Sequence, residues 1–307
     1  MIKNTLPLTG NLYKGNLHTH TTLSDGRFSP EDTAELYRKN GYSFLALTDH
    51  RLYGIHQELN RDDFLIMPGT ELDVDTDVDF HHIVSIGCPD SNTYPHGKRF
   101  QKEKLDAMGL QQTIDDINAH NNIAIYAHPY WSRVKFDAIL SLQNVTGMEI
   151  FNYGCEREWR CGNSEVFYDH YLWNQNYMWC FSTDDAHSAL SLPDDGGGYI
   201  TVKCDSLTHQ NIFDALKSGS FYASAAEKGS EAPVIENFYV EDGVAKIWCS
   251  PCRSVFFNSK GNFFPTHATE KGPITYVEWK LPQNAPYVRA ICVDFNGFSS
   301  WTQPIVL

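Results

Sequence analysis

The sequence lacks several features that would assign the chain to a class at once. It contains no stretch of about 18 apolar residues, so it offers no membrane-spanning helix. Its N-terminus, Met1 to Gly15, lacks the basic-then-apolar order of an export signal. Basic residues number 24 against 38 acidic ones, and the net charge of −14 makes the chain a poor partner for duplex DNA. We therefore expect a cytoplasmic protein that binds neither membrane nor duplex nucleic acid.

The cysteines lack a regular pattern. Eight are spread through the chain, and only Cys249 and Cys252 have a C-x-x-C spacing. A structural zinc site needs four ligands, and no second pair lies near in the sequence. We interpret the eight as free thiols in a reducing compartment, and this pair as two strand or turn thiols.

The glycine run at 196–198 lacks the Lys-Ser/Thr that completes a P-loop. A P-loop that binds the phosphates of a nucleotide is therefore excluded. We interpret the run as an isolated flexible loop.

What the sequence does contain, up to about Ser230, is an alternation of short apolar runs and helix-like stretches. The runs predict buried strands at 15–20, 42–48, 64–67, 82–87, 123–128, 147–151 and 178–182. The stretches between them predict helices at 29–41, 110–120, 137–143, 164–175 and 208–218. Such alternation is typical of a parallel sheet or barrel with crossover helices.

The pattern changes after Ala232. Strand-like segments at 236–250, 273–281 and 287–295 are separated by turn signals such as Glu-Asp-Gly at 241–243. This pattern of short strands and turns predicts a small antiparallel, sandwich-like β domain over 233–307, following an α/β domain over 1–232.

Polar residues stand where the predicted strands begin or end. His18 and His20 are two residues apart, so on a strand both side chains point to one face. Any one such residue is most simply a hydrogen-bonded loop or core residue. Nine of them together predict a metal centre at the end of the sheet where α/β barrels build active sites. The nine are His18, His20, Asp25, His50, Glu71, His82, His128, Asp185 and His187.

The donor set indicates which metals and how many. Nitrogen and oxygen donors without thiolate suit Zn, Mn or Fe, and nine donors are too many for one ion. Two or three divalent ions match the count. Three carboxylates give −3 and three ions +6, so the site would hold a small anionic substrate through its metals. By spacing alone His81 could replace His82, which we choose because it shares strand parity with Val84.

Five motifs together resemble the PHP (polymerase and histidinol phosphatase) family. They are Asn-Leu-His-Thr-His-Thr-Thr-Leu-Ser-Asp-Gly at 16–26, Ala-Leu-Thr-Asp-His at 46–50, Gly-Thr-Glu at 69–71, Ala-His-Pro at 127–129 and Ser-Thr-Asp-Asp-Ala-His at 182–187. The run at 215–224 is similar to the branch that includes carbaryl-hydrolase-like proteins. The resemblance covers about residues 10–225 and implies a distorted (β/α)7 barrel with a trinuclear metal centre.

The resemblance also implies how the ligands are shared. His18, His20, Glu71 and Asp185 would hold the first ion, a bridging Glu71 with His82 and His128 the second, and Asp25, His50 and His187 the third. It implies catalytic roles for Glu71, Asp185 and His187.

We therefore expect a metal-dependent phosphoesterase that cleaves a small phosphorylated metabolite, a nucleotide or sugar phosphate, by attack of a metal-bound hydroxide. Arg51 and Asn152 are the expected substrate contacts, although Arg51 could equally form a surface salt bridge. Asp49, His81 and Asp184 are candidates for proton transfer or for orienting ligands. Aromatic residues within 153–179 form either a helix packing stripe or a pocket wall.

Two other readings stay open at this point. The same trinuclear site could hydrolyse an amide, a carbamate or an ester, and only substrate screening separates this from phosphoester cleavage. The chain could also be a non-catalytic metal-binding module in which the β domain binds a partner. A polymerase subunit is disfavoured because 307 residues leave no room for a polymerase body.

Overall fold

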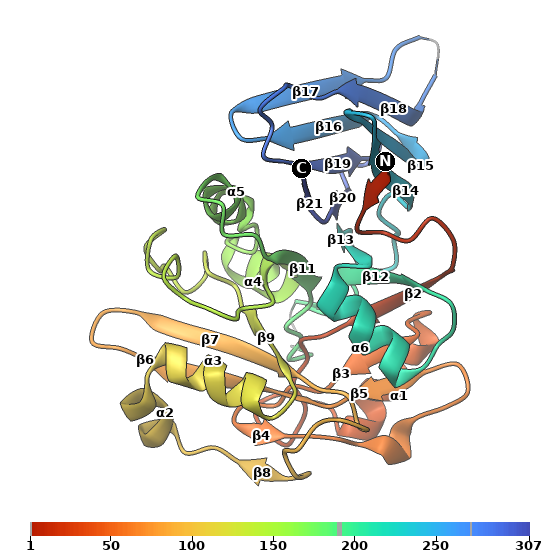
Figure 1. Cartoon of the computed structure of the whole chain (residues 1–307). Helices are drawn as coiled ribbons and strands as arrows, with labels where there is room; N and C mark the ends of the chain where they lie inside the picture. Colours follow the sequence, from red (N-terminus) through yellow and green to blue (C-terminus); the bar gives the residue numbers. More distant parts are fainter. Residues whose placement is uncertain (1, 189–191, 271) are drawn as a thin grey trace.

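The computed structural model describes residues 2–188, 192–270 and 272–307. In Figure 1 an α/β part lies below a smaller β part, and both chain ends lie beside the β part. Two sheets make up the α/β part. The first has five strands in the order β11 (Trp179–Thr183), β10 (Gly147–Asn152), β9 (Ile123–Tyr126), β7 (Phe80–Ile86) and β6 (Gly69–Asp75).

The second sheet runs through both parts of the molecule. Its order is β17 (Asn262–His267), β16 (Ser254–Ser259), β19 (Tyr287–Val293), β20 (Ser299–Thr302), β13 (Phe221–Ala225), β12 (Gly198–Cys204), β2 (Asn11–Asn16), β3 (Phe44–Ala46) and β5 (Leu65–Met67). Isolated bridges between Thr19 and Ala186 and between His50 and Glu71 join it to the first sheet. These two bridges lie where the candidate ligands are.

The prediction of a (β/α)7 barrel is not confirmed, and the fold is mixed α/β. The described strands form several sheets and no closed barrel, and only β2–β3–β5 and β9–β10–β11 are parallel. β6 and β7 are antiparallel because the turn at 76–79 is far too short for the crossover that parallel neighbours need. β12 is antiparallel to both β2 and β13.

The helices cover the outer faces of these sheets. α1 (Pro30–Lys39) starts as predicted, with the Ser29 hydroxyl accepting a hydrogen bond from the Asp32 amide. The other helices are α2 (Lys102–Met108), α3 (Leu110–Ala119), α4 (Tyr153–Trp159), α5 (Glu165–Trp173), α6 (His209–Ser218) and the short 3₁₀ helix η1 (Gln57–Leu59). The helix predicted at 137–143 is wrong. Its amides bond to the third preceding carbonyl, so the segment forms successive turns rather than an α-helix.

The β part is a sandwich of two antiparallel sheets. One is β1 (Ile2–Asn4), β14 (Ile235–Glu241), β15 (Val244–Cys252) and β18 (Ile274–Lys280), and the other is the β17–β16–β19–β20 end of the long sheet. Phe238, Ile247 and Phe257 are buried in the core between them. The remaining strands are β4 (Leu52–Tyr53), β8 (Lys98–Arg99) and β21 (Ile305–Val306).

Hydrogen-bonded pairing continues across the predicted division at residue 232. β13 pairs with β20, and the N-terminal β1 pairs with β14. Whether 1–232 and 233–307 are separate domains stays a prediction.

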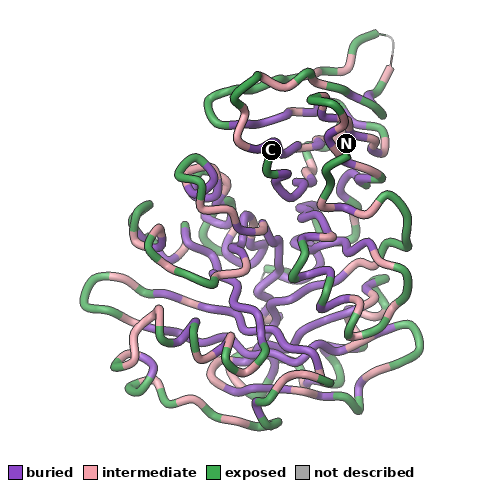
Figure 2. Tube along the Cα trace, in the orientation of Figure 1, coloured by how far each residue is buried: buried purple, intermediate pink, exposed green. Residues whose placement is uncertain are grey.

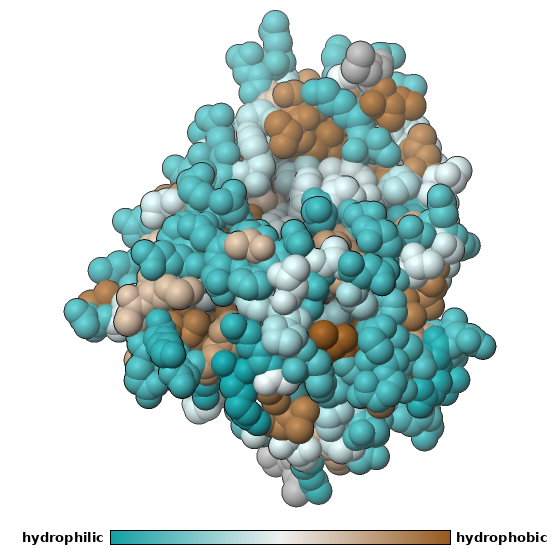
Figure 3. All heavy atoms as spheres, turned by 60° about the horizontal axis from the view of Figure 1, so that its bottom comes forward, coloured by the Kyte–Doolittle hydropathy of each residue, from teal (hydrophilic) through white to brown (hydrophobic). Residues whose placement is uncertain are grey.

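Burial follows this architecture. Figure 2 shows buried residues concentrated along the central strands and exposed ones along the outer helices and hairpin tips. Figure 3 shows a mostly hydrophilic lower face with small, separate hydrophobic patches. No helix in the described ranges is long and apolar enough to cross a membrane.

Candidate metal centre

The nine predicted ligands lie together at one end of the central strands. The structure groups their donor atoms into three sets, within each of which the atoms lie inside 4.8 Å of one another. The sets are His18, His20, Glu71 and Asp185; Glu71, His82 and His128; and His20, Asp25, His50 and His187. They match the three predicted sets, except that His20 also lies with the third. Which ligand holds which ion stays a prediction.

Two backbone hydrogen bonds of the bridge between Thr19 and Ala186 bring these side chains together. The amide of Asp185 donates to the carbonyl of His18 at 2.9 Å, and that of His20 donates to Ala186 at 2.9 Å. Thr19 lies between the two histidines on the opposite face, so His18 and His20 point to the same side, as their spacing predicts. Asp185 adopts a left-handed φ of 53°, a strained conformation often found at functional sites.

Glu71 lies at the middle of the cluster, on β6. Its Oε1 is 2.7 Å from Nδ1 of His82 and 3.3 Å from Nε2 of His128. Its Oε2 is 3.2 Å from Nε2 of His18 and 3.3 Å from Nε2 of His20. The two oxygens thus face different sets of imidazoles, which is the arrangement a bridging carboxylate needs.

Asp25 closes the outer side of the cluster. Its Oδ1 lies 3.5 Å from His20 and 3.6 Å from His187, and its Oδ2 lies 3.5 Å from His50. Asp49 holds the loop that carries it, accepting hydrogen bonds from the Thr21 amide at 2.8 Å and the Ser24 hydroxyl at 2.7 Å. Asp49 therefore has a positioning role here.

Four buried ligand atoms in the cluster make no hydrogen bond within the described chain. They are Nε2 of His18, Nδ1 of His20, Nδ1 of His50 and Oε2 of Glu71. Buried polar atoms normally have a partner, because leaving one unsatisfied costs about 1–3 kcal/mol. Oε2 of Glu71 lies 3.2 Å from Nε2 of His18 and 3.2 Å from Nδ1 of His50, whereas Nδ1 of His20 faces Asp25. Buried atoms without partners at these neighbouring positions fit bound divalent cations, and the imidazole and carboxylate donors suit them as well.

The charges in the cluster depend on one another. Burial alone would raise the pKa of Glu71, but His18, His82 and His50 lower it well below its usual value. Burial alone would lower the pKa of His20, but the nearby carboxylates of Asp185 and Glu71 raise it to about 10. Without metal, protons on His18 and His20 therefore help to balance the carboxylates.

The glycine run at 196–198 supports the metal centre by binding a buried carboxylate, a role that the sequence did not indicate. The amides of Gly196, Gly197 and Gly198 donate to the carboxylate of buried Asp184 at 2.7, 2.9 and 2.7 Å. A Cβ on Gly198 would lie 1.9 Å from the carbonyl oxygen of Thr183. The run is thus a cradle for Asp184 rather than the isolated flexible loop that we expected. Burial raises the pKa of Asp184 to about 7 despite these donors.

Glu149 is the residue that the sequence reasoning missed. It is fully buried on β10, and its Oε1 lies 2.8 Å from Nδ1 of His18, opposite the ring nitrogen that faces Glu71. Its Oε2 accepts from the amide of His128 at 2.9 Å. A carboxylate that bonds the far nitrogen of a ligand histidine fixes its tautomer and ring orientation. The available signal was a lone acid inside the apolar run at 147–151.

Asn152 is also buried, and its side chain is engaged inside the protein. Its amide nitrogen donates to Glu149 at 2.9 Å and to Asp185 at 3.2 Å, and its oxygen caps α4 through the Cys155 amide. These bonds give Asn152 a positioning role. Its contact with substrate stays a prediction.

His81 and His82 point to opposite faces of β7, because neighbouring side chains alternate along a strand. His81 lies on the other face of β7, where its Nδ1 is 2.6 Å from the hydroxyl of Tyr126, whereas His82 faces Glu71. Arg51, the other expected substrate contact, forms an ion pair with Asp73 beside the cluster. Both interpretations offered for Arg51 remain compatible with that position.

A cavity of about 390 Å³ opens directly onto the cluster. Besides ligands, its wall includes Trp131, Cys155, Glu158 and Trp159. A smaller cavity of about 300 Å³ adjoins Asp25 and His50 and includes Arg51 and Arg99. Within the aromatic segment 153–179, Tyr168 and Tyr171 are buried core residues, whereas Trp159 is exposed at the cavity mouth. Both interpretations of that segment therefore hold, for different residues.

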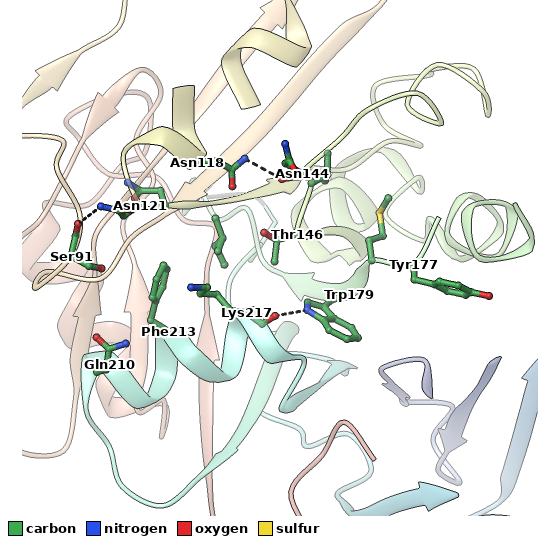
Figure 4. A pocket seen from close by; sticks show the side chains of 14 residues that line it. Ser91, Asn118, Asn121, Asn144, Thr146, Tyr177, Trp179, Gln210, Phe213 and Lys217 are labelled. Atoms are coloured by element: carbon green, nitrogen blue, oxygen red, sulfur yellow. Dashed lines mark hydrogen bonds between the residues drawn. The ribbon is translucent and has the colours of Figure 1, made fainter. Parts of the chain in front are cut away.

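A larger cavity of about 680 Å³ lies at the opposite ends of β9, β10 and β11 (Figure 4). Its polar groups largely bond the backbone: Asn118 donates to the carbonyl of Asn144, Asn121 to that of Ser91, and the Trp179 indole to that of Lys217. Acidic and histidine side chains do not line it. Its size alone therefore does not make it the chemical site.

No family model matches the chain. Over 40 residues it is 52% identical to the DNA polymerase/3'-5' exonuclease PolX of Bacillus subtilis (strain 168), a match that spans 13% of this chain and only 7% of PolX.

Among solved structures, a two-domain protein from Bacteroides vulgatus ATCC 8482, described as containing a predicted PHP-like metal-dependent phosphoesterase, is similar over 95% of this chain and 94% of that one. The identity is 14% and the TM-score 0.51. A putative metal-dependent phosphoesterase from Bifidobacterium adolescentis ATCC 15703 is similar over 59% of this chain and 92% of that one, with 15% identity and a TM-score of 0.42.

The chain therefore shares the fold of the Bacteroides vulgatus protein along almost its whole length. The resemblance to PHP proteins that the motifs predict is confirmed at the level of the fold. The finer resemblance to carbaryl-hydrolase-like proteins stays a prediction.

Proposed function

We propose that this protein is a metal-dependent phosphoesterase that hydrolyses a small phosphorylated metabolite. The observation that carries the proposal is a cluster with four buried ligand atoms that make no hydrogen bond among the described residues, onto which an open cavity leads. His18, His20, Asp25, His50, Glu71, His82, His128, Asp185 and His187 would hold two or three Zn, Mn or Fe ions. When bound, such ions polarise phosphoryl oxygens and activate water.

Charge supports a phosphoester over a neutral amide. Three ligand carboxylates carry −3, so three divalent ions would leave the site at +3 and attractive to an anion. Arg99 borders the adjoining cavity and adds positive charge on the same side, whereas the charge of Arg51 is paired with Asp73. A neutral amide or carbamate would gain less from this net charge, because it carries no charge of its own when it binds.

The chain's own residues would position the reacting groups. Glu149 orients His18, and Asp49 holds the loop that bears Asp25. Trp131 and Trp159 offer flat walls for the organic part of a substrate, since aromatic faces pack against rings. We assign proton transfer to no single residue.

The test is hydrolysis by the full chain loaded with Mn, Zn or Fe and presented with phosphomonoesters, phosphodiesters, amides, carbamates and carboxylic esters. We expect phosphate release, and we expect Glu71→Gln to lower kcat/KM by roughly a thousandfold, since several kcal/mol of charge stabilisation is lost. Glu236→Gln, an exposed change of the same chemistry, is the matched control. Activity on amides or carbamates alone would replace the proposal with the amide-hydrolase alternative, and inactivity on the whole panel would favour a binding module.

A further inference from the structure

A second cluster of potential ligands lies in the β part, far along the chain from the metal centre. Cys249 and Cys252 on β15 meet Cys292 on β19, and their sulfur atoms all lie within 4.8 Å of one another. The three residues are 3%, 0% and 0% exposed. The nine nitrogen and oxygen ligands of the metal centre do not include them, so the proposed function leaves this cluster unexplained.

The backbone brings the three thiols together at the corner of the sandwich. β15 pairs regularly with β18 as far as Trp248, and its register then shifts before Cys252. Beyond Cys252 the chain crosses into β16 of the facing sheet, where Val255 pairs with Cys292. Cys249 and Cys252 thus belong to one sheet and Cys292 to the other, and a ligand common to all three would tie the two sheets together.

Ordinary packing explains each thiol singly, because cysteine is a small hydrophobe. Cys180 shows that case: it is 0% exposed, and its thiol donates to the carbonyl of Thr302 at 3.7 Å. Packing gives no reason for three sulfurs from two sheets to converge. Thiolate sulfur is a soft donor that selects Cu(I), Zn or Fe–S clusters over hard cations.

We propose that Cys249, Cys252 and Cys292 form a structural site for a soft d10 cation, Cu(I) or Zn(II), that cross-links the two sheets of the β part. A metal–thiolate bond of about 2.3 Å places two ligand sulfurs about 4 Å apart, so only small movements separate the present arrangement from coordination. Three donors complete a trigonal Cu(I) site, whereas Zn(II) would need a fourth donor from solvent or the backbone.

The cluster is buried, so the ion must enter as the chain folds. The full chain is therefore unfolded under reducing conditions and refolded with Cd²⁺, which reports thiolate ligands by a sulfur-to-metal charge-transfer band that imidazole and carboxylate ligands do not produce. We expect this band in the wild type and in the matched control Cys180→Ala. In Cys292→Ser we expect it to weaken by at least a third. Refolding with Cd²⁺ together with Cu(I) or Zn²⁺ shows which of these two ions excludes Cd²⁺ from the thiols and so removes the band.

Where Cys292→Ser fails to refold, the wild type still decides the matter. X-ray absorption of the chain refolded with one equivalent of Cu(I), a soft ion that prefers thiolate over imidazole and carboxylate, should show three sulfur neighbours on that ion. If the charge-transfer band is absent and all eight thiols react after unfolding, the three cysteines only pack against one another. If the band is absent and only six thiols react, two cysteines of the cluster form a disulfide. Either result overturns the proposal.

Discussion

Glu71 contacts more of the candidate metal ligands than a single-ion ligand needs to. Both of its oxygens are directed at imidazoles, and one of them has no hydrogen bond among the described residues. Glu149 supports the cluster from outside it, through hydrogen bonds with the His18 ring and with the backbone amide of His128. The two acids are both buried, yet one is placed to hold an ion and the other to hold a ligand.

Replacing Glu149 by Gln tests the positioning role. The amide keeps the shape but places an N–H against donors from His18, His128, Asn152 and Thr183. Loss of such an outer hydrogen bond typically costs 10–100-fold in metal affinity, so we expect the metal Kd to rise by about that factor. Competition with a chelator measures it, and Glu236→Gln is the control. An unchanged Kd would show that His18 needs no such support.

Proton release on metal binding is a second expectation at this scale. The pKa of His20, raised to about 10 by Asp185 and Glu71, leaves its ring protonated near neutrality in the metal-free protein. A ligand histidine must be neutral, so metal binding expels protons and its affinity increases with pH. Calorimetry in buffers of different ionisation enthalpy measures the release. Identical heats in all buffers would contradict it.

The same shift has a consequence for the stability of the metal-free protein. A histidine with a raised folded pKa contributes stability that is fully present below its unfolded value of 6.5 and is lost as pH rises through about 10. Metal-free protein should therefore become less stable between these values while metal affinity increases. Thermal unfolding across that range, with and without metal, separates the two trends.

At the scale of elements, the site is a property of strand ends. The loop 194–198 between the metal centre and β12 wraps the carboxylate of Asp184, whose neighbour Asp185 is a candidate ligand. Gly197 and Gly198 are required because a side chain at either would collide with the ring of Tyr153 or the backbone of Thr183. A glycine run that the sequence presents as a loop is therefore a packed element.

Gly198→Ala tests this element. Its Cβ would lie 1.9 Å from the Thr183 oxygen, so the cradle must shift and Asp184 must lose donors. We expect the free energy of unfolding to fall by about 3 kcal/mol and the metal content to fall with it. Gly229→Ala is the control, because space is open there and only its φ of 80° opposes a side chain, at a cost of about 1 kcal/mol. Equal effects of the two changes in denaturant titrations would contradict the cradle.

At the scale of the whole molecule, the α/β and β parts share a sheet and a buried charge. Arg289 on β19 is fully buried and binds Asp169 at 2.6 Å and Glu165 at 2.8 Å, both on α5. Burial alone would lower the pKa of this guanidinium, but the two carboxylates raise it above its usual value. The ion pair thus joins the sandwich to a helix that covers the central sheet.

Arg289→Ala should destabilise the molecule as a unit. Breaking a buried pair from one side costs about 3–5 kcal/mol, and we expect the lower end because both acids retain some solvent contact. Denaturant unfolding measures the loss, with the exposed Arg253→Ala as the control. A loss confined to one of two separate transitions would show that the parts unfold independently.

The sequence by itself determined which residues could bind metal and that they stand at strand ends, because donor chemistry and strand periodicity are local properties. It also determined the start of α1 through its Ser29 cap, and the change from alternating strands and helices to strands alone after residue 232. Strand parity also favoured His82 over His81. Only the tertiary structure decided that β6 and β7 run antiparallel, and that Glu149 and the glycine run support the centre. It alone also brought Cys292 to the C-x-x-C pair. These outcomes depend on pairing between segments far apart in the chain, which burial and backbone hydrogen bonding select only when the whole fold assembles.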